Sequence, residues 1–206
     1  MNSLVLDFEN KINDSKYSIT DLLRHCLIIA RKLKQNDFAD WINYELNGYL
    51  DVEEIPNYRR IPVSVKFLNP KYGWCPYVIT DEEFNKELSK LPIRNPISEI
   101  EFLASSDTKT IHVGVPSSIK NTLLSSIEFD SDIIFQGNKN SMIGILDAVK
   151  NEMLNWILTL EENGIIDENS IFNNDQIQKA GGITSPIINK FYGDKNKIDL
   201  SQIINK

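Results

Sequence analysis

Five residues between positions 41 and 59 carry the side chains best suited to binding or chemistry: Trp41, Glu45, Tyr49, Tyr58 and Arg59. Trp41 and Glu45 are four residues apart and therefore share one face of a helix. Glu45 can pair with Arg59 if the acidic loop between them folds back. The set contains no nucleophile, so we interpret it as a structural clasp. The alternative is a polar pocket with an aromatic wall that binds a partner or a small ligand.

The other titratable residues do not form a catalytic or metal-binding pattern. His25 precedes Cys26, but residues one apart on a helix point in different directions, which argues against a Cys–His nucleophilic pair. Neither His25 nor His112 has the spacing of metal ligands. The acidic runs 51–54 and 81–83 come without a phosphate-binding loop, and we interpret them as a solvated loop and a helix N-terminus. The sequence therefore predicts no catalytic residue, no metal and no cofactor.

Composition indicates an acidic, soluble globular protein. Of its 206 residues 41% are hydrophobic, and 22 Lys and Arg stand against 29 Asp and Glu, giving a net charge of −7. Sequence-independent binding of nucleic acid depends on basic surfaces, so we expect no nucleic-acid partner. No apolar run approaches the length of a membrane span or of a signal-peptide core. Because Cys26 and Cys75 also suggest no disulfide framework, we expect a cytoplasmic protein without a membrane segment.

The first third of the chain predicts three helices. Residues 1–17 have apolar side chains at helical spacing, and Ser18 is a suitable N-cap for a second helix. Asp37 is expected to cap a third helix, which Gly48 ends in a left-handed conformation. The second and third helices should form an antiparallel hairpin.

Later segments predict short strands and further helices. Residues 61–67 alternate apolar and polar side chains, as in a half-buried strand, and Pro62 suggests that this strand lies at a sheet edge. Residues 69–79 are interpreted as a loop. Further strands are predicted at 110–115 and 132–136, and further helices at 80–91, 97–104, after Pro116 and at 141–163. The whole predicts an α+β fold dominated by helices, with the hairpin and the long central helix packed on a small, mostly antiparallel sheet.

The last segment is apolar and β-prone. We divide the chain into a domain at 1–182 and a tail at 183–206, in which Ile187, Phe191 and Tyr192 are the candidate assembly residues. An unpaired strand at a chain end exposes backbone hydrogen-bonding groups. The tail is therefore expected either to pair back into the sheet or to add a strand to another subunit or partner.

Three motifs resemble the AbiTii domain of bacterial abortive-infection proteins. The first is Trp-Ile-Asn-Tyr-Glu-Leu-Asn-Gly-Tyr at 41–49 with Pro-Asn-Tyr-Arg at 56–59. The second runs from 145 to 165, and the third is 188–194. In the second motif the chain has Lys150 where the family is expected to have arginine. The likeness covers residues 18–195 and implies a role in anti-phage defence, as a separate protein or as a fused or partnered regulatory domain. It does not imply a known reaction.

Together these observations predict a non-catalytic interaction or assembly module that couples sensing of infection to an effector. The expected partner is a second copy of the chain, giving a homo-oligomer, or a defence effector protein. One alternative is a hydrolase that acts on nucleic acid or nucleotides through Glu45, Arg59 and a metal in the acidic loop. A second alternative is a sensor that binds a small ligand or a phage protein.

Overall fold

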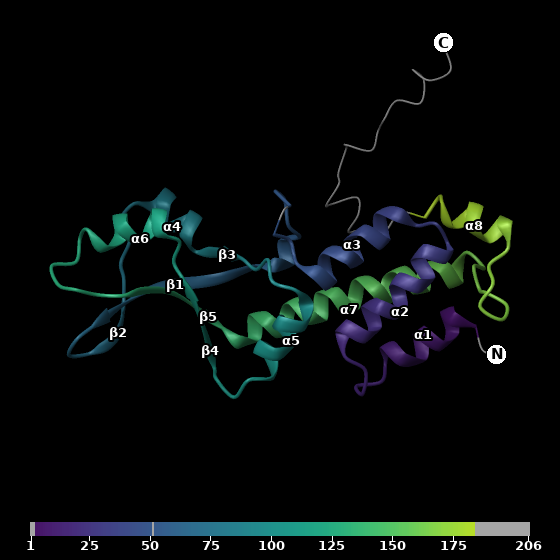
Figure 1. Ribbon diagram of the computed structural model, residues 1–206, viewed down its shortest axis with the longest axis horizontal. Helices are drawn as coiled ribbons and strands as arrows, with labels where there is room; N and C mark the ends of the chain where they lie inside the picture. Colours follow the sequence, from purple (N-terminus) through teal and green to yellow (C-terminus); the bar gives the residue numbers. More distant parts are fainter. Residues whose placement is uncertain (1–2, 51, 184–206) are drawn as a thin grey trace, which may run out of the picture. The chain divides into compact units, whose positions relative to one another are not determined.

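The computed structural model of the 206-residue chain describes residues 3–50 and 52–183 (Figure 1). The described chain divides into two compact units. The first, which we call the helical unit, takes in 3–56 apart from residue 51, 95–98 and 147–183. The second, the sheet unit, consists of Asn57–Arg94 and Glu99–Leu146.

The helical unit is built from helices whose ends are set by local chemistry. Ser18 accepts a hydrogen bond from the backbone amide of Asp21 at 3.0 Å and so begins the second helix, as predicted. Gly48 has a φ of +89°, which glycine adopts without steric cost, and it ends the third helix. The helices are α1 (Leu4–Ile12), α2 (Ile19–Lys32), α3 (Asn36–Asn47), the larger part of α7 (Lys139–Glu162) and α8 (Asn174–Ala180).

The core of the helical unit includes one side of α7. Val149, Met153 and Ile157 recur at helical spacing on this side and are fully buried. Phe38 of α3 stacks on Trp156 of α7 with ring centroids 4.3 Å apart. The apolar side predicted for the long helix is therefore the side that packs inward.

The sheet unit contains five antiparallel strands. The longest is β1 (Arg60–Asn69), which pairs with β2 (Gly73–Pro76), β3 (Lys90–Pro92) and β5 (Ile133–Asn138), while β4 (Thr110–Gly114) pairs with β5. The strand order is β2-β1-β5-β4, with β3 beside the first residues of β1. The helical elements of this unit are the 3-10 turn η1 (Asn57–Arg59), α4 (Glu82–Leu88), most of α5 (Ile97–Ser105), α6 (Ser117–Leu124) and the start of α7.

The two faces of the sheet have different surroundings. Val65 and Phe135 pack with Leu88 of α4 and Leu123 of α6, so these two helices cover one face (Figure 1). Successive strand residues point to opposite faces. The other face carries alternate residues of β1, namely Arg60, Pro62, Ser64, Lys66 and Leu68, and the residues paired with them. We call it the open face, because its side chains are exposed or half-buried.

The prediction that Asp37 caps the third helix is wrong. Helix α3 begins at Asn36, and its N-cap is Gln35, whose side chain makes no capping hydrogen bond. The chain reverses at Lys34, which has a φ of +57°. The amide of Gln35 then bonds to the carbonyl of Ala30 at 2.9 Å, so the turn between α2 and α3 closes before Asp37 is reached.

The prediction that Pro62 marks an edge strand is also wrong, because β1 has partners on both sides. The ladder between β1 and β5 begins at Val63 and Gly137, so the missing N–H of Pro62 falls where that pairing ends. The predicted loop at 69–79 contains strand β2. Gly73, with a φ of +73°, forms part of the turn that brings β2 back onto β1.

The α+β class, dominated by helices and with a small antiparallel sheet, is confirmed. The predicted strands at 110–115 and 132–136 correspond to β4 and β5. Across the described ranges no helix is long and apolar enough to cross a membrane. The candidate assembly residues Ile187, Phe191 and Tyr192 lie outside the described residues.

Candidate functional site

Trp41, Glu45 and Tyr49 lie in the interior of the helical unit, each with an exposed fraction of 0%. The Tyr49 hydroxyl donates a hydrogen bond to the Glu45 carboxylate, and the two oxygens are 2.7 Å apart. The ring of Tyr49 stacks with that of Tyr44, with centroids 5.5 Å apart. Hydrogen bonds to a carboxylate are strong, so this one holds Glu45 firmly. These three of the five predicted site residues therefore present no surface to solvent.

Tyr58 and Arg59 belong to the sheet unit, where η1 leads into β1. The Arg59 side chain is fully buried, and its guanidinium donates a hydrogen bond to the carbonyl of Ile93 at 3.1 Å. The backbone of the same two residues is joined by a second hydrogen bond, from the Ile93 amide to the Arg59 carbonyl, at 2.8 Å. Arg59 therefore ties η1 to the chain that follows β3. Its pairing with Glu45, a residue of the other unit, stays a prediction.

His25 lies against two charged residues of α1. Its Nε2 is 3.7 Å from Asp7 Oδ2, and its Nδ1 is 3.5 Å from Lys11 Nζ. Lys11 and Asp7 form an ion pair at 2.6 Å. Burial and the Lys11 charge lower the pKa of His25, and the Asp7 charge opposes them only in part. The neutral imidazole is therefore favoured, and both of its nitrogens face partners on α1.

Cys26 does not offer a nucleophile to His25. Its side chain is fully buried, and burial raises the pKa of the thiol well above its ordinary value. Because the thiolate is the reactive form of cysteine, this environment disfavours reaction.

Asp167 is a buried carboxylate that sequence reasoning missed. It is 3% exposed, and it accepts hydrogen bonds from the Val5 amide at 3.1 Å and from the Ser170 amide at 2.9 Å. It thereby satisfies an amide in the first turn of α1, where helix amides lack partners within the helix. The sequence carries no local signal for this role, because the helix that Asp167 contacts lies 162 residues earlier.

The acidic run at 81–83 has a structural role that matches its interpretation. The Asp81 carboxylate accepts a hydrogen bond from the Phe84 amide at 2.8 Å and caps α4. Among the residues that the structure describes, no group of three or more His, Cys, Asp or Glu side chains is placed to hold a metal ion.

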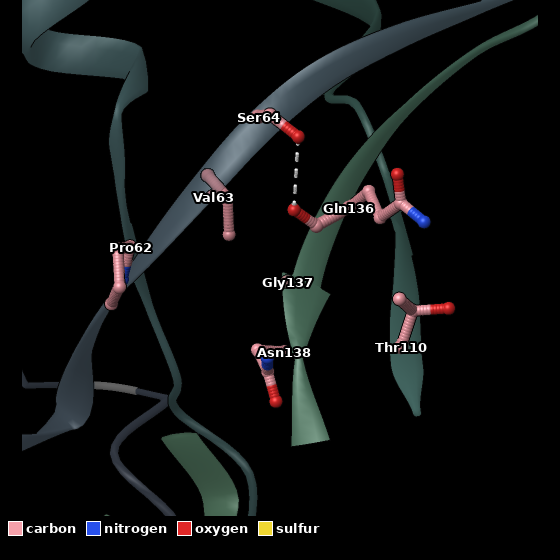
Figure 2. Close-up of a pocket in the computed structure, with 7 residues that line it drawn as sticks. All are labelled: Pro62, Val63, Ser64, Thr110, Gln136, Gly137 and Asn138. Atoms are coloured by element: carbon pink, nitrogen blue, oxygen red, sulfur yellow. Dashed lines mark hydrogen bonds between the residues drawn. The ribbon is translucent and has the colours of Figure 1, made fainter. Parts of the chain in front are cut away.

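The open face gathers polar side chains from three neighbouring strands. Ser64 of β1, Gln136 of β5 and His112 of β4 lie in register across the sheet, and Thr110 and Asn138 form the pair two positions away. The Ser64 hydroxyl donates a hydrogen bond to the Gln136 carbonyl at 3.5 Å. Figure 2 shows this part of the sheet, where Ser64, Thr110, Gln136 and Asn138 help to line a shallow depression of about 370 Å³.

The open face also carries cations and an aromatic pair. Arg60, Lys66 and Lys90 project from β1 and β3, whereas the sequences of the five strands contain no Asp or Glu. The rings of Trp74 and His112 meet edge to face, with centroids 6.1 Å apart. Sequence reasoning missed this surface because its residues are scattered over three separate segments. The absence of acidic residues from the strands was the only signal of it.

These observations define a helix-dominated α+β protein in which Trp41, Glu45, Tyr49 and Arg59 of the first motif are buried. The family model AbiTii matches residues 3–184, and the chain therefore belongs to the AbiTii family. This membership suggests an abortive-infection protein, that is, one of antiviral defence. No curated protein and no solved structure gives a significant match to the chain.

Proposed function

We propose that this protein is a non-catalytic interaction module of an abortive-infection system. In this role it associates with itself or with an effector protein and couples detection of phage to the effector. The observation that carries the proposal is the burial of Trp41, Glu45 and Tyr49, each with no exposed surface. Residues that act on a soluble substrate need access to it. The motif that identifies the family is therefore better suited to holding the fold than to chemistry.

An edge of the sheet supports the assembly role. Strand β4 is last in the strand order, and its described partner is β5. The amide of Lys139 bonds to the carbonyl of Lys109 at 3.1 Å, so Lys109 and Lys139 form a hydrogen-bonded pair of the antiparallel ladder. The next pair, Thr110 and Asn138, is therefore a non-hydrogen-bonded pair. The backbone groups of Thr110, His112 and Gly114 therefore point away from β5. Such an edge can take up a strand from another chain.

The proposed assembly uses this edge together with the tail residues Ile187, Phe191 and Tyr192. The tail is β-prone in sequence and supplies the kind of segment that pairs with an exposed edge. A tail from one copy that pairs with β4 of another would give a homo-oligomer. The same pairing offered by an effector protein would couple the two proteins.

Light scattering after size exclusion tests the proposal on the full chain, on a chain that ends at Gly182, and on a Thr110→Pro variant. Proline at the first position of a strand is tolerated, and here it removes an N–H that points outward. We expect the full chain to exceed the monomer mass of 23.6 kDa and both altered chains to approach it. Thr80→Pro, in the loop before α4, controls for proline itself. A full chain that is monomeric both alone and with the products of neighbouring genes contradicts the proposal.

A further inference from the structure

We propose that the open face of the sheet binds single-stranded nucleic acid, with Trp74 stacking on a base and with Arg60, Lys66 and Lys90 contacting phosphates. This inference goes beyond the proposed function, since assembly through β4 does not require it. It also differs from the expectation drawn from the net charge. The reason is that charge is distributed unevenly between the sheet and the rest of the molecule.

The strands of the sheet carry positive charge although the chain as a whole is acidic. The chain as a whole carries a net charge of −7, yet the five strands of the sheet unit contain three cationic residues and no carboxylate. Arg60 and Lys90 are exposed and Lys66 is half-buried. None of the three forms an ion pair with another described residue. Cations that form no ion pair are available to a polyanion, whose phosphates release counterions when they are neutralised.

The three cations are spread along the open face. Lys90 pairs across the strands with Pro62, and Arg60 lies two residues before Pro62 on the same face. Lys66 lies four residues beyond Pro62, a distance of about 13 Å at the rise of a strand. The cations therefore flank the polar centre around Ser64 instead of gathering at one point. A backbone that runs along β1 would meet positive charge before and after this centre.

The open face also carries a partly exposed aromatic ring, that of Trp74. Trp74 is 38% exposed, and its contact with His112 orients the indole across the sheet. Aromatic side chains on a sheet face are stacking platforms for unpaired bases. In a duplex the faces of the bases are already stacked, so this feature favours a single strand.

Polar side chains beside the ring suit the edges of bases. Gln136 and Asn138 each carry a donor and an acceptor, and Ser64 and Thr110 carry hydroxyls. The carboxylates of an acidic peptide would satisfy the cations but would not stack on Trp74, whereas each nucleotide supplies both a phosphate and a base that can stack. The combination therefore favours nucleic acid over an acidic protein segment.

The tryptophans provide a direct assay on the intact protein. Trp41 and Trp156 are 0% and 1% exposed, so Trp74 is the tryptophan that a base can reach. Titration with an oligothymidine strand of about twelve nucleotides, within the range of known single-strand sites, should quench fluorescence saturably. With three phosphate contacts the logarithm of the binding constant should fall with the logarithm of salt concentration with a slope of about −2.

Matched variants separate the named residues from general charge. Lys90→Ala should weaken binding and reduce the salt slope by about 0.7. Lys86→Ala removes an exposed cation four residues away, on α4 at the covered face, and should change neither. Trp74→Ala should weaken binding about tenfold, as measured by the fluorescence anisotropy of a labelled oligothymidine. Phe102→Ala, which removes an aromatic side chain of α5 that is 75% exposed, should leave it unchanged.

Three outcomes would overturn the proposal. The first is the absence of saturable quenching at low salt. The second is equal weakening by Lys86→Ala and Lys90→Ala, which would mean binding to charge in general. The third is displacement of the bound oligothymidine by polyglutamate at equal charge, which would assign the face to an acidic protein. Light scattering without oligonucleotide reports assembly separately, so either proposal can fail alone.

Discussion

Ser3 and Asp167 lie 164 residues apart in the chain, and the Ser3 hydroxyl donates a hydrogen bond to the Asp167 carboxylate at 2.7 Å. Ser3 is the N-cap of α1, so this bond ties the beginning of the first helix to the segment that follows α7. The Val5 and Ser170 amides complete the site. One carboxylate thus connects the start of α1 with the loop that follows α7.

Replacement of Asp167 should therefore destabilise the protein. Asp167→Ala leaves buried donors of α1 without their acceptor, which costs about 1–3 kcal/mol in the free energy of unfolding. Urea denaturation followed by circular dichroism measures this change. Asp130→Ala, which alters an exposed carboxylate, is the control and should change the free energy little. Equal stability of the two variants would contradict the assigned role.

The stabilising effect of Asp167 should depend on pH in a defined direction. Burial raises the pKa of this carboxyl, but hydrogen bonds from the Leu4, Val5 and Ser170 amides and from Ser3 outweigh burial, and its pKa lies below the ordinary value of 3.8. The stabilisation is therefore fully present above pH 3.8 and is lost as the pH falls through the folded pKa. We expect the stability difference between the natural protein and Asp167→Asn to narrow as the pH falls below this value. A difference that is constant down to pH 2 would refute the assignment.

Loss of the Tyr49–Glu45 hydrogen bond should reduce both the stability of the protein and its protection against phage. Tyr49→Phe leaves the buried Glu45 carboxylate without this donor, at a cost of about 1–3 kcal/mol. Tyr44→Phe removes a neighbouring hydroxyl for which the described residues provide no hydrogen bond, and it is the control. Melting temperature and phage protection should both fall for Tyr49→Phe and for Glu45→Gln. If Glu45→Gln abolished protection at an unchanged melting temperature, Glu45 would act in catalysis or in ligand binding and the clasp interpretation would be wrong.

The pKa of His25 should respond in opposite directions to its two charged neighbours. After burial, the Lys11 charge is the next cause that lowers this pKa below 6.5, whereas Asp7 raises it. Lys11→Met should therefore raise the pKa and Asp7→Asn should lower it further, as measured by NMR titration of the ring protons. Lys16→Met, in the exposed turn after α1, should leave the pKa unchanged.

The lowered pKa of His25 also has a consequence for stability. Protonation of His25 favours the unfolded chain, so its contribution is present above pH 6.5 and is lost as the pH falls through the folded pKa. His25→Gln, which cannot take up a proton, should lose less stability over this range. An identical pH profile for the two proteins would argue against a lowered pKa of His25.

Two glycines of the sheet unit should respond oppositely to substitution. A Cβ at Gly137 would lie 3.1 Å from Cγ1 of Ile111 and 3.2 Å from Cδ1 of Ile61, so Gly137→Val should destabilise the protein by about 1–3 kcal/mol through overpacking. A Cβ at Gly144 on α7 meets no atom within 4 Å. Gly144→Ala should therefore stabilise the helix by about 0.5–1 kcal/mol. Thermal denaturation of the two variants measures both effects, and destabilisation by Gly144→Ala would contradict the exposed position of that glycine.

Features that depend on neighbouring residues could be predicted from the sequence. The alternation from Ile61 to Phe67 predicted β1, and helical periodicity identified the buried side of α7 at Val149, Met153 and Ile157. Ser18 and Gly48 were recognised as helix ends because capping needs only the next few residues of the chain. Asp37 failed as a cap because the turn before it was closed by the backbone of Lys34 and Gln35.

Features that depend on distant residues were decided by tertiary structure alone. The sequence predicted that Pro62 belongs to a strand, but whether that strand is central depends on β3 and β5, which come later in the chain. In the sequence Asp167 does not differ from the other acidic residues, and only the fold places Ser3 within hydrogen-bond distance of it. The open face arises in the same way, because only pairing of β1 with β3 and β5 places Lys90 and Gln136 near Ser64. Local periodicity determines which elements form, whereas the choice among possible strand and helix neighbours is made by burial over the whole chain, which no short window of sequence contains.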